Sequence, residues 1–159
     1  MPWQHFMTMS NELGSAKILT CPGDQQRLAN MRMDFSTPPG TGLLDKKNAA
    51  ISYTVGMEAD ETQPDVPLSH DRNVGRSDSR NVCIASYAEG LNGVTFDAMW
   101  ATGTDGNTGH HGDAGNLVLS DGSLQQQSTQ LLQQTLRKSA ERLRMAGRPD
   151  KQSILTLFP

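Results

Sequence analysis

The clearest hydrophobic pattern along the chain predicts a helix near the C-terminus, over residues 128–147. Leu132, Leu136 and Leu143 recur there at roughly helical spacing, and Ser128 offers a side-chain oxygen that can cap the first turn. A glycine and a proline follow the stripe and can end the helix. Basic residues crowd its second half, which we interpret as compensation of the helix dipole on a solvated face.

Shorter patterns predict a second helix and several strands. The apolar positions within residues 1–14 predict a short docking helix, or the stump of a longer one, that Gly14 ends. Alternating apolar and polar residues over Ala50–Gly56 give the strongest strand prediction. Other short apolar runs predict strands at 17–21, 82–85 and 95–100, and a last strand or packed tail within 148–159.

A hairpin is predicted shortly before the C-terminal helix. Asn116–Leu119 is a short apolar run, and Asp121 with Gly122 forms a strong two-residue turn signal. Nine residues separate His111 from this Asp-Gly pair. We interpret His111 first as a structural, hydrogen-bonding histidine and second as a ligand or an active group.

Together these elements predict one α+β domain over residues 1–159, with the sheet and its loops within 15–127. Hydrophobic residues make up only 35% of the chain and aromatic residues 5%. A modest core with long loops is therefore expected.

Charge and hydropathy narrow the classes of partner. The formal net charge is −3, without a basic stripe or arm, so neither nucleic acid nor a charged membrane surface is an expected partner. No run approaches the roughly 20 apolar residues of a membrane-spanning helix, and the first residues lack the layout of a signal peptide. We therefore expect a soluble chain. Cys21 and Cys83 fit either two thiols or one disulfide, the latter only in an exported protein.

One glycine-rich loop carries candidate metal ligands. Asp105, Asn107 and Asp113, with His111 beside them, resemble the oxygen-rich ligand sets that hold calcium. The spacing departs from the usual calcium loop, so a structural turn is the favoured interpretation. Zinc held by His110 and His111 with Asp113 or Asp121 is an alternative, although adjacent histidines diverge in an extended chain.

The polar run Ser69–Asn73 is a weaker candidate for chemistry. Asp71 and Arg72 are sequence neighbours, and such pairs usually make a local ion pair or cap a turn. The chain contains no G-x-S-x-G elbow, Walker loop or dinucleotide fingerprint. Common hydrolase, NTPase and dehydrogenase mechanisms therefore lack their usual support.

Several short motifs, taken in order, resemble bacterial prepilin-like proteins that carry a C-terminal H-X9-DG signature. The motifs are Ser10–Gly14, Ile18–Asp24, Ile51–Gly56, Ala59–Glu61, Asp71–Asn73, Gly115–Asn116, and His111 with Asp121 and Gly122. The resemblance implies a type IV pilin-like or type II secretion pseudopilin-like domain, in which a helix packs on a small antiparallel sheet. The family's N-terminal cleavage site and hydrophobic helix are not in this chain, so we expect a soluble domain that follows a membrane anchor.

The resemblance also implies a function. It favours a non-enzymatic subunit of the cell envelope, periplasmic or on the cell surface, without a cofactor, whose partners are other pilin-like or secretion-system subunits. The alternative is an exported metal-binding module, or a small metal-dependent enzyme, centred on His110, His111, Asp113 and Asp121.

Overall fold

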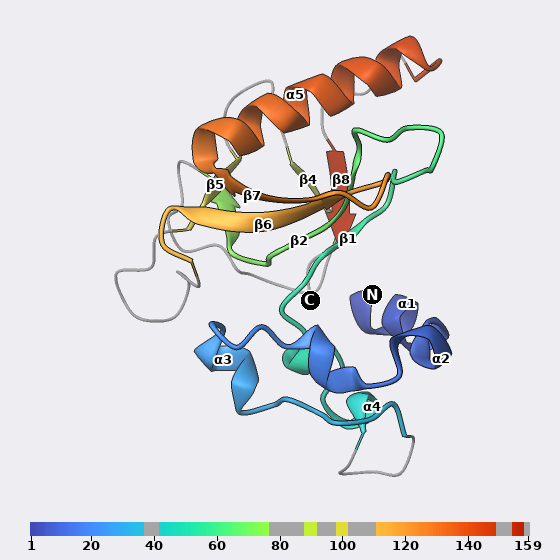
Figure 1. The fold of residues 1–159 in the computed structure, drawn as a ribbon, viewed down its shortest axis with the longest axis vertical. Coiled ribbons are helices and arrows are strands. Elements are labelled where there is room, and N and C mark those ends of the chain that lie inside the picture. The colour runs from blue at the N-terminus through green and yellow to red at the C-terminus, as the bar shows by residue number, and fades with distance from the viewer. Residues whose placement is uncertain (37–41, 77–87, 92–97, 102–110, 149–153, 158–159) are drawn as a thin grey trace.

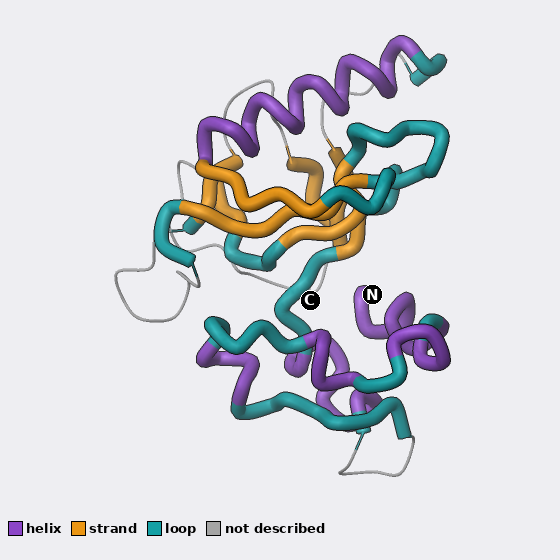
Figure 2. The backbone as a smooth tube through the Cα atoms, viewed as in Figure 1, coloured by secondary structure: helices purple, strands orange, loops and turns teal. Residues whose placement is uncertain are grey.

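The computed structural model of the chain has an α+β fold arranged in layers. Short helices from the first fifty residues lie on one side, antiparallel strands lie in the middle, and one long helix, α5, covers the opposite side (Figure 1). Figure 2 shows the same division, with the strands confined to the middle layer. The residues described are 1–36, 42–76, 88–91, 98–101, 111–148 and 154–157.

The N-terminal layer is built from short helical segments joined by tight turns. They are α1 (Pro2–Thr8), α2 (Ser10–Leu13), η1 (Ala16–Leu19), α3 (Gln25–Leu28), α4 (Leu43–Lys46) and η2 (Lys47–Ala50). The predicted helix over residues 1–14 is thus two helices that meet at Met9, and Gly14 ends the second with a φ of 68°. Side chains from this region pack on a buried cluster of Ala16, Leu19, Leu43, Ala50 and Ile51.

One strand prediction in this half was wrong, and another was only partly right. Residues 17–21 fall largely in η1, because the Ser15 hydroxyl accepts a hydrogen bond from the backbone N–H of Lys17 and starts a turn. Within Ala50–Gly56 only the last two residues form a strand, β1 (Val55–Gly56). Ile51, Ser52 and Thr54 are all buried, so the alternation in polarity does not correspond to one buried and one solvated face.

The middle layer is antiparallel. Its strands pair in the orders β2-β6-β7, β1-β8-β4 and β3-β5. The bounds are β2 (Pro67–His70), β3 (Val74–Arg76), β4 (Ala88–Leu91), β5 (Ala98–Trp100), β6 (Ala114–Leu119), β7 (Leu124–Ser128) and β8 (Ile154–Leu157). The last three residues of the strand expected at 95–100 form β5, and its first three lie outside the described residues. The C-terminal strand is present as β8, and the strand expected at 82–85 also lies outside the described residues.

The predicted hairpin is confirmed as β6 and β7, which pair from Ala114 opposite Ser128 to Val118 opposite Leu124. Gly122 in the connecting turn has a φ of 82°, a conformation that suits glycine. Along β6 the residues alternate between buried and partly buried, so the period-2 pattern here reflects a real buried face.

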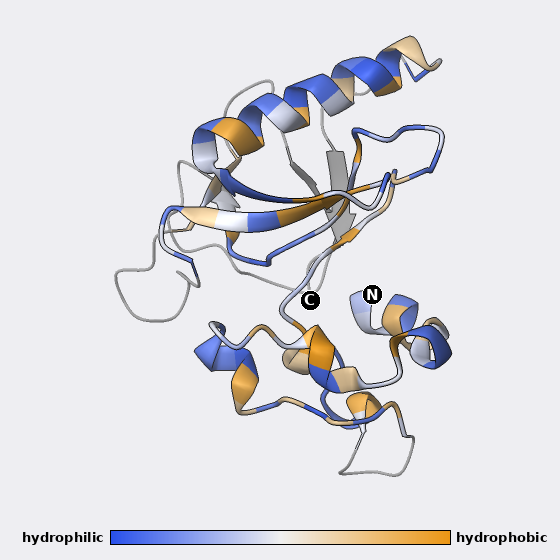
Figure 3. Cartoon of the chain, in the orientation of Figure 1, coloured by the Kyte–Doolittle hydropathy of each residue, from blue (hydrophilic) through white to orange (hydrophobic). Residues whose placement is uncertain are grey.

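The predicted C-terminal helix is confirmed as α5 (Thr129–Met145). The Ser128 hydroxyl caps it by accepting from the N–H of Leu131 at 3.4 Å. Its leucine stripe packs on the strands in one buried cluster of Val66, Val74, Ala98, Trp100, Leu117, Leu119, Leu132, Leu136, Ala140 and Leu143. Much of the rest of its surface is polar (Figure 3), but Leu131 and Met145 are exposed as well. None of the helices described has the length and hydropathy to cross a bilayer.

Candidate functional site

A buried ion pair links the N-terminal layer to the sheet. Arg72 lies between β2 and β3, and its Nε and Nη2 donate to Oδ2 and Oδ1 of Asp24 at 2.6 and 2.8 Å. Asp24 is fully buried at the start of α3, where it also accepts from the N–H of Arg27 and from the Ser52 hydroxyl. A two-point pair with further hydrogen bonds is the arrangement in which buried charges are tolerated.

Asp71, the neighbour of Arg72, faces a different partner. Its Oδ2 accepts from the backbone N–H and the side-chain amide of Asn116 on β6, at 2.7 and 3.0 Å. The same oxygen lies 3.5 Å from Nε2 of His111. Burial raises the pKa of Asp71, and the hydrogen bonds from Asn116 and the nearby His111 oppose this shift.

His111 lies between this carboxylate and a thiol. Its Nε2 is 3.6 Å from Sγ of Cys21, a buried free thiol. Burial, together with the neighbouring Cys21 and Asp71, raises the pKa of Tyr53 to about 12. One ring nitrogen of His111 faces both Cys21 and Asp71, whereas a nucleophile–base–carboxylate relay uses two different ring nitrogens. The geometry is therefore that of a packed hydrogen-bonding histidine.

A second histidine, His70, is buried completely beside this group. Its Nδ1 lies 2.7 Å from the carbonyl oxygen of Asp71, and its ring meets that of Trp100 edge-on at 6.2 Å. Burial lowers the pKa of His70 to about 4, so the imidazole is neutral at neutral pH. The Nδ1–H then donates to the carbonyl and fixes the direction of the ring.

We call Asp24, Ser52, Asp71, Arg72, His111 and Asn116 the polar clasp. Backbone hydrogen bonds also link the segments that carry these residues. The N–H of Ser52 donates to the carbonyl oxygen of Leu19, that of Arg72 to the carbonyl oxygen of Ser52, and that of Asp71 to the carbonyl oxygen of Asn116. These bonds run from the N-terminal cluster to β6. The clasp therefore joins the two hydrophobic clusters of the chain.

Of the two structural interpretations given for Asp71 and Arg72, a local ion pair or a turn cap, the ion pair between them is not formed. Alternate side chains of an extended segment point to opposite sides, so Asp71 turns to β6 while Arg72 turns to α3. Sequence spacing carried no sign of the Arg72–Asp24 pair. The only available signal was that both residues belong to motifs of the same resemblance.

The two halves of the H-X9-DG signature lie in different surroundings. His111 is part of the polar clasp, and its side chain is 25% exposed. Asp121 and Gly122 are exposed in the hairpin turn, where Oδ1 of Asp121 accepts from the N–H of Ser123 at 2.8 Å. Hydrogen bonding by the side chain of Ser123, together with this backbone bond, lowers the pKa of Asp121. The structure thus gives the Asp-Gly pair a role in the turn.

The structure describes only part of the predicted metal site. Asp105, Asn107 and His110 lie outside the described residues, and Asp113 is exposed at the start of the hairpin. Among the residues that are described, no three His, Cys, Asp or Glu side chains are placed to hold a metal ion. Calcium and zinc binding stay predictions. The disulfide stays a prediction too: the structure gives Cys21 a free thiol, and Cys83 lies outside the described residues.

Comparison with family models, with curated proteins and with solved structures found no match to this chain.

Proposed function

We propose that this chain is the globular domain of a non-enzymatic, prepilin-like subunit of a type IV pilus-like or type II secretion-like envelope assembly. Its loops would serve contacts with other subunits or with an exported partner.

The observation that carries the proposal is the meeting of the motif residues in space. Asp24, Arg72 and His111 belong to three motifs of the prepilin-like resemblance that are far apart in the sequence. In the fold they lie in the polar clasp, where Asp24 and Arg72 are buried, His111 is partly exposed, and each makes contacts that hold segments together. If these three motifs together stabilise one fold, they are expected to occur together in proteins that share that fold.

The chemistry of the clasp also favours a structural role. Arg72 is occupied by Asp24 and by the side-chain oxygen of Gln26, which it reaches at 2.6 Å. The carboxylate of Asp71 is directed at Asn116. Side chains held in this way fix the conformation of the backbone. That conformation is a long helix packed on antiparallel strands, as the resemblance implies.

The test is to express the epitope-tagged protein from its own gene and to cross-link intact cells before fractionation. We expect the protein in the envelope fraction, cross-linked to subunits that carry pilin-type N-terminal helices. Loss of the assembly's inner-membrane components should abolish these cross-links.

A matched control is Arg72→Met, which breaks the clasp without touching the surface. We expect this variant to be destabilised and to form fewer cross-links, whereas Asp121→Ala should keep both the stability and the cross-links of the original chain. A protein that stays in the cytosolic fraction and forms no such cross-links would contradict the proposal.

A further inference from the structure

The turn between β6 and β7 carries an Asp-Gly unit that is open to a spontaneous reaction. Asp121 is followed directly by Gly122, and both residues are exposed. Glycine has no Cβ to hinder the approach of its amide nitrogen to the preceding side chain, so aspartate before glycine cyclises more easily than aspartate before other residues. The other Asp-Gly pair of the chain, Asp105–Gly106, lies outside the described residues.

The reaction is a cyclisation followed by hydrolysis. The amide nitrogen of Gly122 attacks Cγ of Asp121, so that a C–N bond forms and a C–O bond of the carboxyl group breaks. One water molecule leaves, made from the amide hydrogen and the carboxyl OH. Water then opens the five-membered imide at either carbonyl and gives aspartate again or isoaspartate. The forward step needs a protonated carboxyl group and an amide that is free to reach it.

Hydrogen bonds in the turn oppose both requirements. The N–H of Gly122 donates to the carbonyl oxygen of Leu119 at 2.9 Å, and Oδ1 of Asp121 accepts from the N–H of Ser123 at 2.8 Å. Hydrogen bonding by the Ser123 side chain, together with this backbone bond, holds the pKa of Asp121 below its usual range and keeps the carboxyl group ionised. Cyclisation would break both backbone bonds, so the turn must open before it can react.

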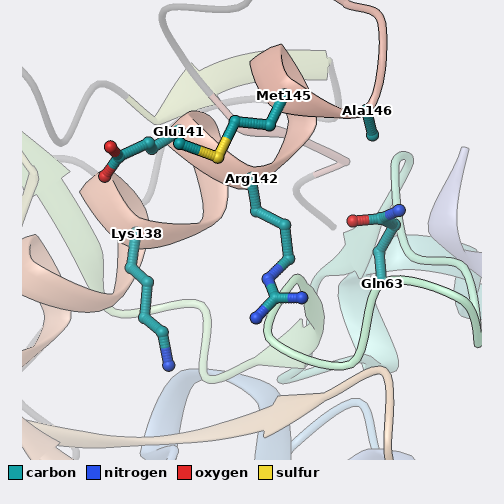
Figure 4. Close-up of a pocket in the computed structure, with 6 residues that line it drawn as sticks. All are labelled: Gln63, Lys138, Glu141, Arg142, Met145 and Ala146. Carbon is teal, nitrogen blue, oxygen red and sulfur yellow. The ribbon is translucent and has the colours of Figure 1, made fainter.

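The turn is also anchored to the rest of the fold. The backbone N–H and the hydroxyl of Ser120 both donate to the carbonyl oxygen of Val66, each at 2.9 Å. The loop that carries Val66 is held to α5 by ion pairs of Lys138 and Arg142 with Asp65. Figure 4 shows both basic side chains extending from the helix toward this loop. Opening of the turn therefore works against contacts that reach as far as α5.

Isoaspartate would change the hairpin itself. The main chain of isoaspartate passes through the side-chain carbons and gains one methylene, whereas the geometry of a tight turn fixes the register of its two strands. In this register Val118 lies opposite Leu124, and Asn116 on the same strand donates to Asp71 of the polar clasp. A converted hairpin would therefore re-form poorly.

We propose that Asp121–Gly122 is a modification site for isoaspartate formation, which the closed hairpin protects through the bonds to Ser123 and Leu119 and which reacts when the hairpin opens. Conversion would then mark chains that have been unfolded. This inference goes beyond the proposed function and does not depend on it.

The test incubates the protein at about pH 6, folded in buffer or unfolded in guanidinium chloride, and follows isoaspartate by chymotryptic mapping with mass spectrometry. Cleavage at Leu117 and Leu119 separates this pair from Asp105–Gly106. Residue 121 should convert at least about tenfold more slowly in the folded protein, since two hydrogen bonds must break first. Equal rates in the two states would overturn the protection, and an unfolded chain without isoaspartate at 121 would overturn the site.

Ser123→Ala removes the hydroxyl that helps to keep the Asp121 carboxyl group ionised. It should raise the rate in the folded protein a few-fold and leave the rate in guanidinium chloride unchanged. Ser120→Ala is the matched control, because it removes a hydroxyl from the same turn that bonds to Val66 instead of to the carboxylate. The backbone bond of Ser120 remains, so its rate should change less than about twofold. Equal acceleration by the two variants would overturn the part given to Ser123. Thermal melting confirms that each variant is folded, and the comparison of folded and unfolded wild-type protein needs no variant.

Discussion

Arg72 and Asp24 form a buried ion pair although they lie 48 residues apart in the sequence. Nε and Nη2 of Arg72 donate to the two carboxylate oxygens of Asp24 at 2.6 and 2.8 Å. The Arg72 side chain is 2% exposed and that of Asp24 is 0% exposed. Neither charge can turn to water if its partner is removed. The pair is therefore one of the buried contacts that hold the N-terminal layer to the sheet, beside the backbone hydrogen bonds of the clasp.

Arg72→Met should destabilise the fold by about 3–5 kcal/mol, because it leaves the Asp24 carboxylate buried without its counter-charge. The measurement is the free energy of unfolding from urea titration. Asp45→Asn is the matched control, since Asp45 pairs with Arg32 at a similar 2.8 Å but its side chain is 27% exposed. That exposed pair should contribute less than about 1 kcal/mol.

The double variant Asp24→Asn/Arg72→Met distinguishes a lost pair from lost volume. Removing both charges should recover part of the stability lost in Arg72→Met, because no unpaired charge is left buried. A double variant as unstable as the sum of the two single changes would show that the charges do not interact.

A second prediction concerns the tight packing of Trp100 against Gly115 on β6. A Cβ built at this position would lie 2.3 Å from Cζ3 of Trp100, whose indole is fully buried. Gly115→Ala should therefore destabilise the fold by about 1–3 kcal/mol through overpacking. Urea unfolding measures the effect, and near-ultraviolet circular dichroism reports the displaced indole.

A smaller partner should relieve the same clash. In the background of Trp100→Leu, which is itself destabilising, the added methyl of Gly115→Ala should cost much less than it does with the indole present. An equal cost in both backgrounds would place the strain in the backbone of β6 instead of at Trp100.

Local signals explain which elements the sequence could predict. The β6–β7 hairpin has a turn that only a few residue types form easily, and α5 has a cap, a leucine stripe and a glycine after its end. Each of these signals acts within a few residues. The Ala50–Gly56 prediction failed because Ser52 and Thr54 are buried by hydrogen bonds to distant carbonyls and carboxylates, which a polarity pattern does not record.

The candidate site was only partly predictable for the same reason. His111 could be singled out as a hydrogen-bonding residue, and its structural interpretation agrees with its place beside Asp71. The partner of Arg72 could not be read from spacing, since Asp24 lies 48 residues away. Long-range pairs follow from topology, and one sequence does not show how its segments pack.

The metal-binding alternative predicts a dependence of stability on divalent ions. A ligand that binds only the folded state stabilises it according to its concentration and affinity. If His111 serves the clasp and no metal is bound, EDTA should leave the melting temperature unchanged. Elemental analysis of the purified protein should then find no stoichiometric calcium or zinc. A melting temperature that falls with EDTA and returns with added calcium would instead support a site that includes Asp105, Asn107 and Asp113.

The buried His70 predicts how stability depends on pH. Its pKa falls from 6.5 to about 4 on folding, so between these values the unfolded state binds more protons than the folded state. The contribution of His70 is fully present above pH 6.5 and is lost as the pH falls toward 4, for a total of about 3 kcal/mol. The raised pKa of Asp71 acts in the opposite sense, because its protonation in the folded state adds stability as the pH falls through that pKa.

Urea unfolding at intervals between pH 7.5 and 4 measures this contribution, with His70→Gln as the non-titrating control. The wild-type protein should lose stability steadily below pH 6.5, and the variant should show a flatter profile over the same range. Parallel profiles for the two proteins would mean that groups other than His70 dominate the acid sensitivity. The fully buried imidazole beside Trp100 would then have to accept a proton in the folded state, against the cost of burying its charge.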